Sequence, residues 1–216
     1  MDFTHARTTM VDNQIRTEDV TDWDVLRSFL TVPREEFVPE DQRSLAYIGK
    51  DLVLPNGRRL MTPSAFARLL QLLLVQRGQS VLIVGAGTGY AAAVIAPLAG
   101  KVVALEEDEA LVGLARNALG RAAVSNVKLV AGPLTDGWAS EGPYDRIFFE
   151  GAVEEVPIGF ADQLVEGGRM VVVEGRGNAA TARLYLKEGG GVSNRFAFNC
   201  SVPMLPGFTR PPAFVF

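Results

Sequence analysis

The stretch SVLIVGAGTGYAAAVI, residues 80–95, decides the fold. Four apolar residues at 81–84 predict a buried strand, and Gly85, Gly87 and Gly89 follow it directly before an apolar run that predicts a helix. Glycines let the chain turn sharply there, and they let backbone N–H groups at the helix N-terminus approach a ligand. The stretch therefore predicts the first strand–loop–helix unit of an α/β sheet with a binding loop.

The same rhythm of strands and helices continues along the chain. We expect further strands at 101–106, 127–130, 145–150 and 169–174, with helices at about 89–98, 108–119 and 157–166. After Gly175, the segments TARLYLK and SNRFAFN flank the turn EGGG, which predicts an antiparallel hairpin. The predicted fold class is α/β: a doubly wound, mostly parallel seven-stranded sheet with a C-terminal antiparallel hairpin and an N-terminal helical cap.

The segments on either side of the sheet define the expected organisation of the chain. Apolar spacing predicts a helix within 18–30, and Thr62 followed by a proline predicts the start of a helix at about 63–76. We expect a helical cap over 1–62, the α/β domain over 63–205 and a Pro/Phe-rich strap over 206–216. The C-terminal MLPGFTRPPAFVF is too apolar for a free tail. Its alternatives are an extended strap over the domain, a lid over the site, or a homodimer contact.

Composition and charge exclude several classes of function. The 216 residues suit one compact domain, and 21 basic against 25 acidic residues leave a net charge of −4, which argues against nucleic acid as a partner. No apolar run approaches the ~18 to 20 residues that a membrane span needs. One cysteine, Cys200, and one histidine, His5, allow no disulfide, no zinc cage and no histidine-based triad. These features predict a cytoplasmic protein without a metal.

The spacing of the glycines distinguishes between cofactors. A dinucleotide-binding loop needs a third glycine three residues after the second, but that position holds Tyr90, so the pattern is GxGxG. The next strand ends at Glu106, where a carboxylate at the edge of the sheet can accept hydrogen bonds from ribose hydroxyls. The GxGxG loop and Glu106 together indicate a nucleoside-containing ligand. The alternative is that the glycines serve only close packing.

Five segments, including the glycine loop, carry a family resemblance. They are VPREEFVP (32–39), AYIGKDLVLPNG (46–57), VLIVGAGTGYAAAVIA (81–96), GPYDRIFFEGAVEEVP (142–157) and QLVEGGRMVVVEG (163–175). With the GxGxG loop, the chain resembles the S-adenosylmethionine-dependent methyltransferases, and over about 10–204 it is similar to the protein-L-isoaspartate O-methyltransferase family. The resemblance implies a cytoplasmic enzyme that transfers the methyl group of S-adenosyl-L-methionine to the free α-carboxylate of isoaspartyl residues in damaged proteins. A carboxylate is already ionised at neutral pH, so this chemistry requires no general base.

The resemblance also implies which residues form the site. Cofactor contacts are expected from the glycine loop and from the ends of the two neighbouring strands, at Gly85, Ala86, Gly87, Gly89, Tyr90, Glu106, Glu107, Gly132, Pro133 and Leu134. The catalytic candidates are Met61 and Thr62, because the family motif GQTISQP aligns with GRRLMTP at 57–63 and its serine falls on Met61. No metal is implied.

Three departures from the family lead us to expect weak cofactor binding. Met61 replaces the family serine, Ile83 replaces an acid two residues before the first glycine, and Pro133 replaces the aspartate that reads adenine. Thr62 has an alternative role as a helix N-cap, and Arg58 either attracts an anionic substrate or is solvated. The functional alternatives are a methyltransferase for another carboxylate acceptor and a non-catalytic binding module.

Overall fold

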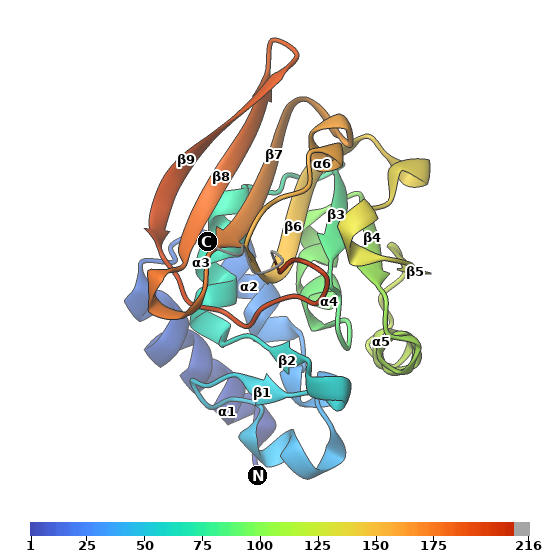
Figure 1. Cartoon of the computed structure of the whole chain (residues 1–216). Coiled ribbons are helices and arrows are strands. Elements are labelled where there is room, and N and C mark those ends of the chain that lie inside the picture. Colours follow the sequence, from blue (N-terminus) through green and yellow to red (C-terminus); the bar gives the residue numbers. More distant parts are fainter. Residues whose placement is uncertain (210–216) are drawn as a thin grey trace, which may run out of the picture.

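The computed structural model describes residues 1–209, and its centre is one seven-stranded sheet (Figure 1). The strand order is β5-β4-β3-β6-β7-β8-β9. The strands are β3 (Ser80–Val84), β4 (Lys101–Glu106), β5 (Val127–Ala131), β6 (Tyr144–Val153), β7 (Leu164–Glu174), β8 (Thr181–Glu188) and β9 (Gly191–Asn199). The strands β3 to β7 pair in parallel, while β8 and β9 are antiparallel. The predicted α/β fold class is confirmed.

The central strand β3 is the point where the chain changes direction across the sheet. From β3 the chain continues to β4 and β5 on one side, and β6 then returns to pair with β3 on the other. Val84 lies in register with Leu105 of β4 and with Phe149 of β6. In open α/β sheets, ligands bind at the carboxyl ends of the strands beside such a switch point.

Helices surround the sheet and build the N-terminal segment. The α-helices are α1 (Phe3–Met10), α2 (Trp23–Thr31), α3 (Pro63–Leu73), α4 (Tyr90–Ile95), α5 (Glu109–Arg121) and α6 (Gly159–Asp162). Shorter helical turns are η1 (Val11–Ile15), η2 (Arg16–Glu18), η3 (Arg34–Phe37), η4 (Glu40–Leu45), η5 (Pro55–Gly57), η6 (Ala96–Leu98), η7 (Leu134–Asp136), η8 (Ala139–Glu141) and η9 (Gly177–Ala179). The N-terminal segment also contains a two-stranded sheet of β1 (Leu52–Val53) and β2 (Arg59–Leu60). The segment predicted to be helical therefore contains both helices and strands.

Three helix boundaries differ from the prediction for local reasons. The helix expected within 18–30 begins at Trp23, because the Asp22 carboxylate accepts the first-turn N–H groups of Asp24 at 2.9 Å and Val25 at 3.1 Å. Helix α3 ends before Leu74, which adopts a left-handed φ of 54°. The helix expected at 157–166 is wrong in length.

Helix α6 covers only Gly159–Asp162, since the backbone from Leu164 onward is already paired with β6. In the described part of the chain, no long helix covers that side of the sheet. Its buried layer is completed by η7 and by two residues of the C-terminal segment, Leu205 and Phe208. The opposite face packs against the N-terminal segment and helices α2 to α5 in one continuous core that includes Ile83. Ile83 is thus a buried strand residue, as its place in the apolar run at 81–84 predicts.

The C-terminal segment runs across the carboxyl ends of the parallel strands (Figure 1). The Ala152 N–H donates to the Pro203 carbonyl at 2.8 Å, the Leu205 N–H donates to the Ala152 carbonyl at 2.8 Å, and the Glu154 N–H donates to the Phe208 carbonyl at 3.1 Å. As far as Thr209 the segment is a strap held on β6. Residues 210–216 of the predicted strap lie outside the described residues. In residues 1–209, no helix has the length and apolar character needed to cross a bilayer.

Candidate cofactor site

The glycine loop after β3 has the backbone conformation that its sequence predicts. Gly85, Gly87 and Gly89 have φ values of 84°, 54° and 88°, in the left-handed region that side chains other than glycine rarely adopt. Gly89 is the N-cap residue of α4. A Cβ atom at Gly85 would lie 2.5 Å from Leu205 Cδ2 and 3.1 Å from Arg58 Nη2, so the face of this loop is already covered by the protein's own side chains.

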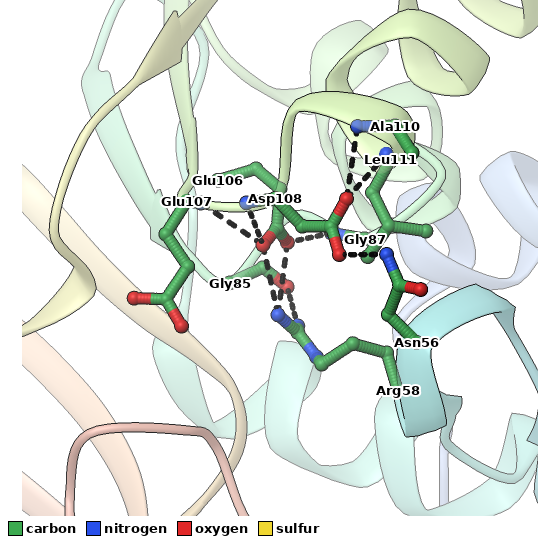
Figure 2. Close-up of polar contacts among 9 residues, drawn as sticks. All are labelled: Asn56, Arg58, Gly85, Gly87, Glu106, Glu107, Asp108, Ala110 and Leu111. Carbon is green, nitrogen blue, oxygen red and sulfur yellow. Dashed lines mark hydrogen bonds and ion pairs between the residues drawn. The ribbon is translucent and has the colours of Figure 1, made fainter.

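Glu106, the expected ribose acceptor, is fully buried at the end of β4 and has its hydrogen-bonding capacity in use (Figure 2). Its carboxylate accepts backbone N–H groups from Gly87 at 2.7 Å, Glu107 at 3.0 Å and Asp108 at 3.2 Å. Arg58 Nη1 donates to both carboxylate oxygens, at 2.9 and 3.1 Å. A carboxylate offers about four acceptor positions, so no free oxygen faces a ligand in this arrangement.

Arg58 reaches the site from the β1–β2 segment, and it is not the solvated residue that we considered. Its side chain is about one-tenth exposed, and its Nη2 donates to the Gly85 carbonyl at 2.9 Å. The segment is fixed at its other end by Asn56, whose amide donates to the Asp108 carboxylate at the N-terminus of α5 (Figure 2). Arg58 therefore occupies the place beside the glycine loop that the sequence assigns to a nucleoside.

The remaining cofactor candidates lie around this point in different ways. Glu107 is exposed, and its carboxylate lies apart from the Arg58 guanidinium, with no contact drawn between them (Figure 2). The Gly132 N–H donates to the Glu106 carbonyl at 3.1 Å, and a Cβ atom at Gly132 would lie 2.9 Å from the ring of Trp138. Pro133 and Leu134 follow at the start of η7, and Leu134 is fully buried. Ala86 is also buried. The fold thus brings the predicted loop, Glu106 and Gly132 to one edge of the sheet.

Tyr90 is part of the core rather than of an open surface. It is fully buried, and its ring packs against Phe29, Phe37 and Phe66 at centroid distances of 6.4, 5.7 and 5.9 Å. Burial raises the pKa of its phenol.

The two catalytic candidates, Met61 and Thr62, take structural roles in this arrangement. Thr62 Oγ1 accepts the Ala65 N–H at 3.3 Å, which is the N-cap contact of α3. Met61 is 2% exposed, and its carbonyl accepts a hydrogen bond from Arg34 Nη2 at 2.8 Å. Neither side chain presents a polar group to the glycine loop.

Two buried charged residues near the site were missed by the sequence interpretation. Arg34 is fully buried in η3, with its guanidinium 4.7 Å from the Tyr90 ring centroid. Glu150 follows Phe149 in β6 and is 6% exposed. Within residues 1–209, Glu150 Oε2 has no hydrogen-bond partner. An acid directly after two apolar strand residues was the available signal for Glu150.

The electrostatics of Glu150 favour its neutral form. Burial raises the pKa of its carboxyl well above the usual range, and Glu106 raises it further, while Arg58 and Arg34 act in the opposite direction. In the described part of the chain, no group of three or more His, Cys, Asp and Glu side chains could hold a metal ion.

The residues fit S-adenosylmethionine only in part. The glycine loop and the switch point of the sheet suit an adenosyl ligand. Glu106, the carboxylate that we expected to accept the ribose hydroxyls, is bound to Arg58, and Leu205 lies over Gly85. In the arrangement seen here the site is closed.

Relatives and solved structures point to one family. The chain is 33% identical over 98% of its length to the protein-L-isoaspartate O-methyltransferase of Koribacter versatilis, and it covers 96% of that protein. A solved protein-L-isoaspartate O-methyltransferase superposes with a TM-score of 0.81 at 28% identity, covering 93% of this chain and 66% of that one.

A third comparison supports the fold alone. The putative protein-L-isoaspartate O-methyltransferase from Plasmodium falciparum, solved in complex with S-adenosyl-L-homocysteine, has a TM-score of 0.78 at 19% identity, covering 92% of this chain and 97% of that one.

The sequence pattern of the protein-L-isoaspartate(D-aspartate) O-methyltransferases matches residues 5–203. The chain with this glycine loop and this sheet therefore belongs to the protein-L-isoaspartate(D-aspartate) O-methyltransferase family.

Proposed function

We propose that this protein transfers a methyl group from S-adenosylmethionine to the free α-carboxylate of isoaspartyl residues in damaged proteins. The observation that carries the proposal is the family match over residues 5–203, which includes the glycine loop at the switch point of the sheet. Membership of the family makes the chain a methyltransferase, and the family uses S-adenosylmethionine.

The residues of the chain are compatible with this chemistry. S-adenosylmethionine supplies a methyl group on a sulfonium, and an ionised carboxylate attacks it without a general base. The lone His5 lies exposed in α1, and the proposed reaction does not require it. The task left to the protein is to hold the two reactants close and aligned, which can contribute about 7–11 kcal/mol.

One observation favours a second candidate function. Arg58 and Leu205 close the site, and the Thr62 hydroxyl is engaged as an N-cap, so it does not replace the family serine. These features support a family member that acts on a different carboxylate, or a binding module without catalysis. The two candidates differ in whether methyl transfer occurs and to which acceptor.

The experiment is a methyl-transfer assay that compares an isoaspartyl peptide with its normal aspartyl counterpart, using radiolabelled S-adenosylmethionine and measuring volatile methanol after alkaline hydrolysis. Transfer to the isoaspartyl peptide alone supports the proposal. Glu106→Gln should lose transfer, whereas Glu109→Gln, a matched change of an exposed acid three residues further on, should retain it. Absence of transfer from saturating cofactor to either peptide refutes the isoaspartyl assignment.

We also propose a cytoplasmic location and a homodimer that uses the C-terminal segment. The cytoplasmic location is supported by the single cysteine, Cys200, since secreted domains of this kind are commonly cross-linked by disulfides. The dimer is supported by the apolar composition of the C-terminal residues. Light scattering on the intact chain and on a chain ending at Thr209 tests the dimer. The same number of subunits for both chains would refute a dimer that uses the C-terminal segment.

A further inference from the structure

The side chain of Arg58 stands where a ribose would have to bind. A ribose diol recognised by Glu106 would donate two hydroxyl groups to its carboxylate oxygens. Arg58 Nη1 already donates to both of these oxygens, at 2.9 and 3.1 Å, and Glu106 is fully buried. Arg58 and a nucleoside therefore compete for the same acceptor atoms, and both cannot bind there at once.

A second buried carboxyl flanks the same loop. Val84 lies in register with Leu105 and Phe149, so the residues that follow them, Glu106 and Glu150, lie on either side of Gly85. Neighbouring strands are about 4.8 Å apart, and residues in register on parallel strands project to the same face. Arg58 Nη2 is bonded to the Gly85 carbonyl, between the two acids.

Glu150 is unusual because one of its carboxyl oxygens has nothing to bind. Glu150 Oε2 is buried and has no hydrogen-bond partner within residues 1–209. Buried polar atoms without a partner are rare in native proteins, because each costs the desolvation of the group without a compensating bond. Glu150 Oε2 can therefore accept a hydrogen bond from the Arg58 guanidinium, which lies one strand away at Gly85, if Arg58 leaves Glu106.

From this geometry, and resting on the proposed use of S-adenosylmethionine, we propose that Arg58 is a gate on the cofactor site, which leaves Glu106 for Glu150 when the cofactor ribose binds. The charges balance in both states. In the closed state the carboxylate of Glu106 and the guanidinium of Arg58 cancel, and Glu150 carries its proton. In the open state Glu150 has released one proton to solvent, and its new negative charge offsets the positive charge that the sulfonium brings.

The neighbours of Glu150 determine how its proton behaves. The charged groups that act on its carboxyl are Arg58 from the β1–β2 segment, Glu106 from β4 and Arg34 from η3. Arg34 keeps its contacts with the carbonyls of Ala46 and Met61 in the closed state. Movement of Arg58 toward Glu150 therefore adds a cation beside this acid and removes its proton.

The test measures binding of S-adenosylmethionine by calorimetry to the intact wild-type chain and four variants. Arg58→Gln should bind about tenfold tighter, which corresponds to about 1.4 kcal/mol, because Glu106 is no longer occupied. The matched control Arg59→Gln changes a neighbouring exposed arginine and should bind as the wild type does. Glu150→Gln should bind about tenfold weaker, since it cannot form an ion pair with the displaced Arg58.

The double variant Arg58→Gln/Glu150→Gln separates the gate from a structural effect. It should bind like Arg58→Gln alone, because Glu150 matters only when Arg58 must move. Calorimetry in buffers of different ionisation enthalpy should detect release of about one proton per cofactor from the wild type and none from either single variant. The Glu150→Gln measurements stand even if Arg58→Gln fails to fold, which circular dichroism would reveal.

The possible outcomes separate this proposal from the proposed function. Equal or weaker binding by folded Arg58→Gln overturns the gate, while methyl transfer by the wild type leaves the proposed function intact. Tighter binding by Arg58→Gln without transfer to an isoaspartyl peptide supports the gate and refutes the isoaspartyl substrate. No heat from any chain at millimolar cofactor overturns both.

Discussion

Removing Arg58 alone should destabilise the fold more than removing the whole ion pair. In Arg58→Met, Glu106 keeps its three backbone N–H donors but loses the one cation, among residues 1–209, that touches its buried carboxylate. Removing one partner of a buried ion pair costs about 3–5 kcal/mol of stability. Because three N–H donors still stabilise the Glu106 carboxylate, we expect a loss of about 3 kcal/mol. For a chain of 150–250 residues this lowers Tm by about 6–12 °C.

A double-mutant cycle provides the measurement. Urea unfolding followed by circular dichroism would compare the wild type, Arg58→Met, Glu106→Gln and the double variant. The double variant should lose less stability than Arg58→Met alone, because it leaves no uncompensated charge, and its loss should therefore be well below the sum of the two single losses. Arg59→Met, a change of an exposed neighbour, should shift stability by less than about 0.5 kcal/mol. If Arg58→Met matches that control, or the single losses simply add, the ion pair does not stabilise the fold as we argue.

Three further outcomes are expected. Burial raises the pKa of Glu150, so the folded chain holds this proton to higher pH than the unfolded chain does, and the free energy of unfolding falls as pH rises above the usual carboxyl range. Urea unfolding should therefore show that the stability of Glu150→Gln relative to the wild type increases from about pH 5 to about pH 8. A difference that stays constant over this range would contradict the raised pKa. Thr62→Ala should lose about 1 kcal/mol of stability while Thr62→Ser stays close to the wild type, and equal losses would exclude the N-cap role. Cys200 is 8% exposed and burial raises its pKa to about 11, so a disulfide reagent at about pH 8 should label it slowly in the folded chain and rapidly in urea, whereas equally fast labelling would contradict its burial.

The sequence predicted the sheet well because periodicity reports burial directly. The runs at 81–84 and 170–173 are apolar on both faces, as strands covered on both sides are, and they lie within β3 and β7. The helix expected at 157–166 was wrong because its apolar residues are shared between a short turn and the start of β7. Only the pairing of Leu164 with Tyr144 distinguishes these alternatives, and local spacing does not encode it.

The conformation of the glycine loop and the position of Glu106 at the end of a strand were predicted from the sequence, whereas the side chains that contact them were not. The positions of the glycines and Glu106 follow from local turn and strand signals. The partner of Glu106 is Arg58, which is 48 residues away in the chain, and the cover over Gly85 comes from Leu205. Such distant contacts depend on how the N-terminal segment and the strap fold back over the sheet. The family comparison identifies the chemistry, whereas only the structure identifies what closes the site.

The strap on β6 has a consequence for how the chain acquires its form during synthesis. Leu205 contacts Gly85 and is made after every strand of the central sheet, the last of which ends at Asn199. Domains generally fold as units, so the sheet and the strap complete one another rather than form in separate stages. The cover over Gly85 is therefore set only when this late segment has joined β6, and the loop owes its closed form to a part of the chain far from it in sequence.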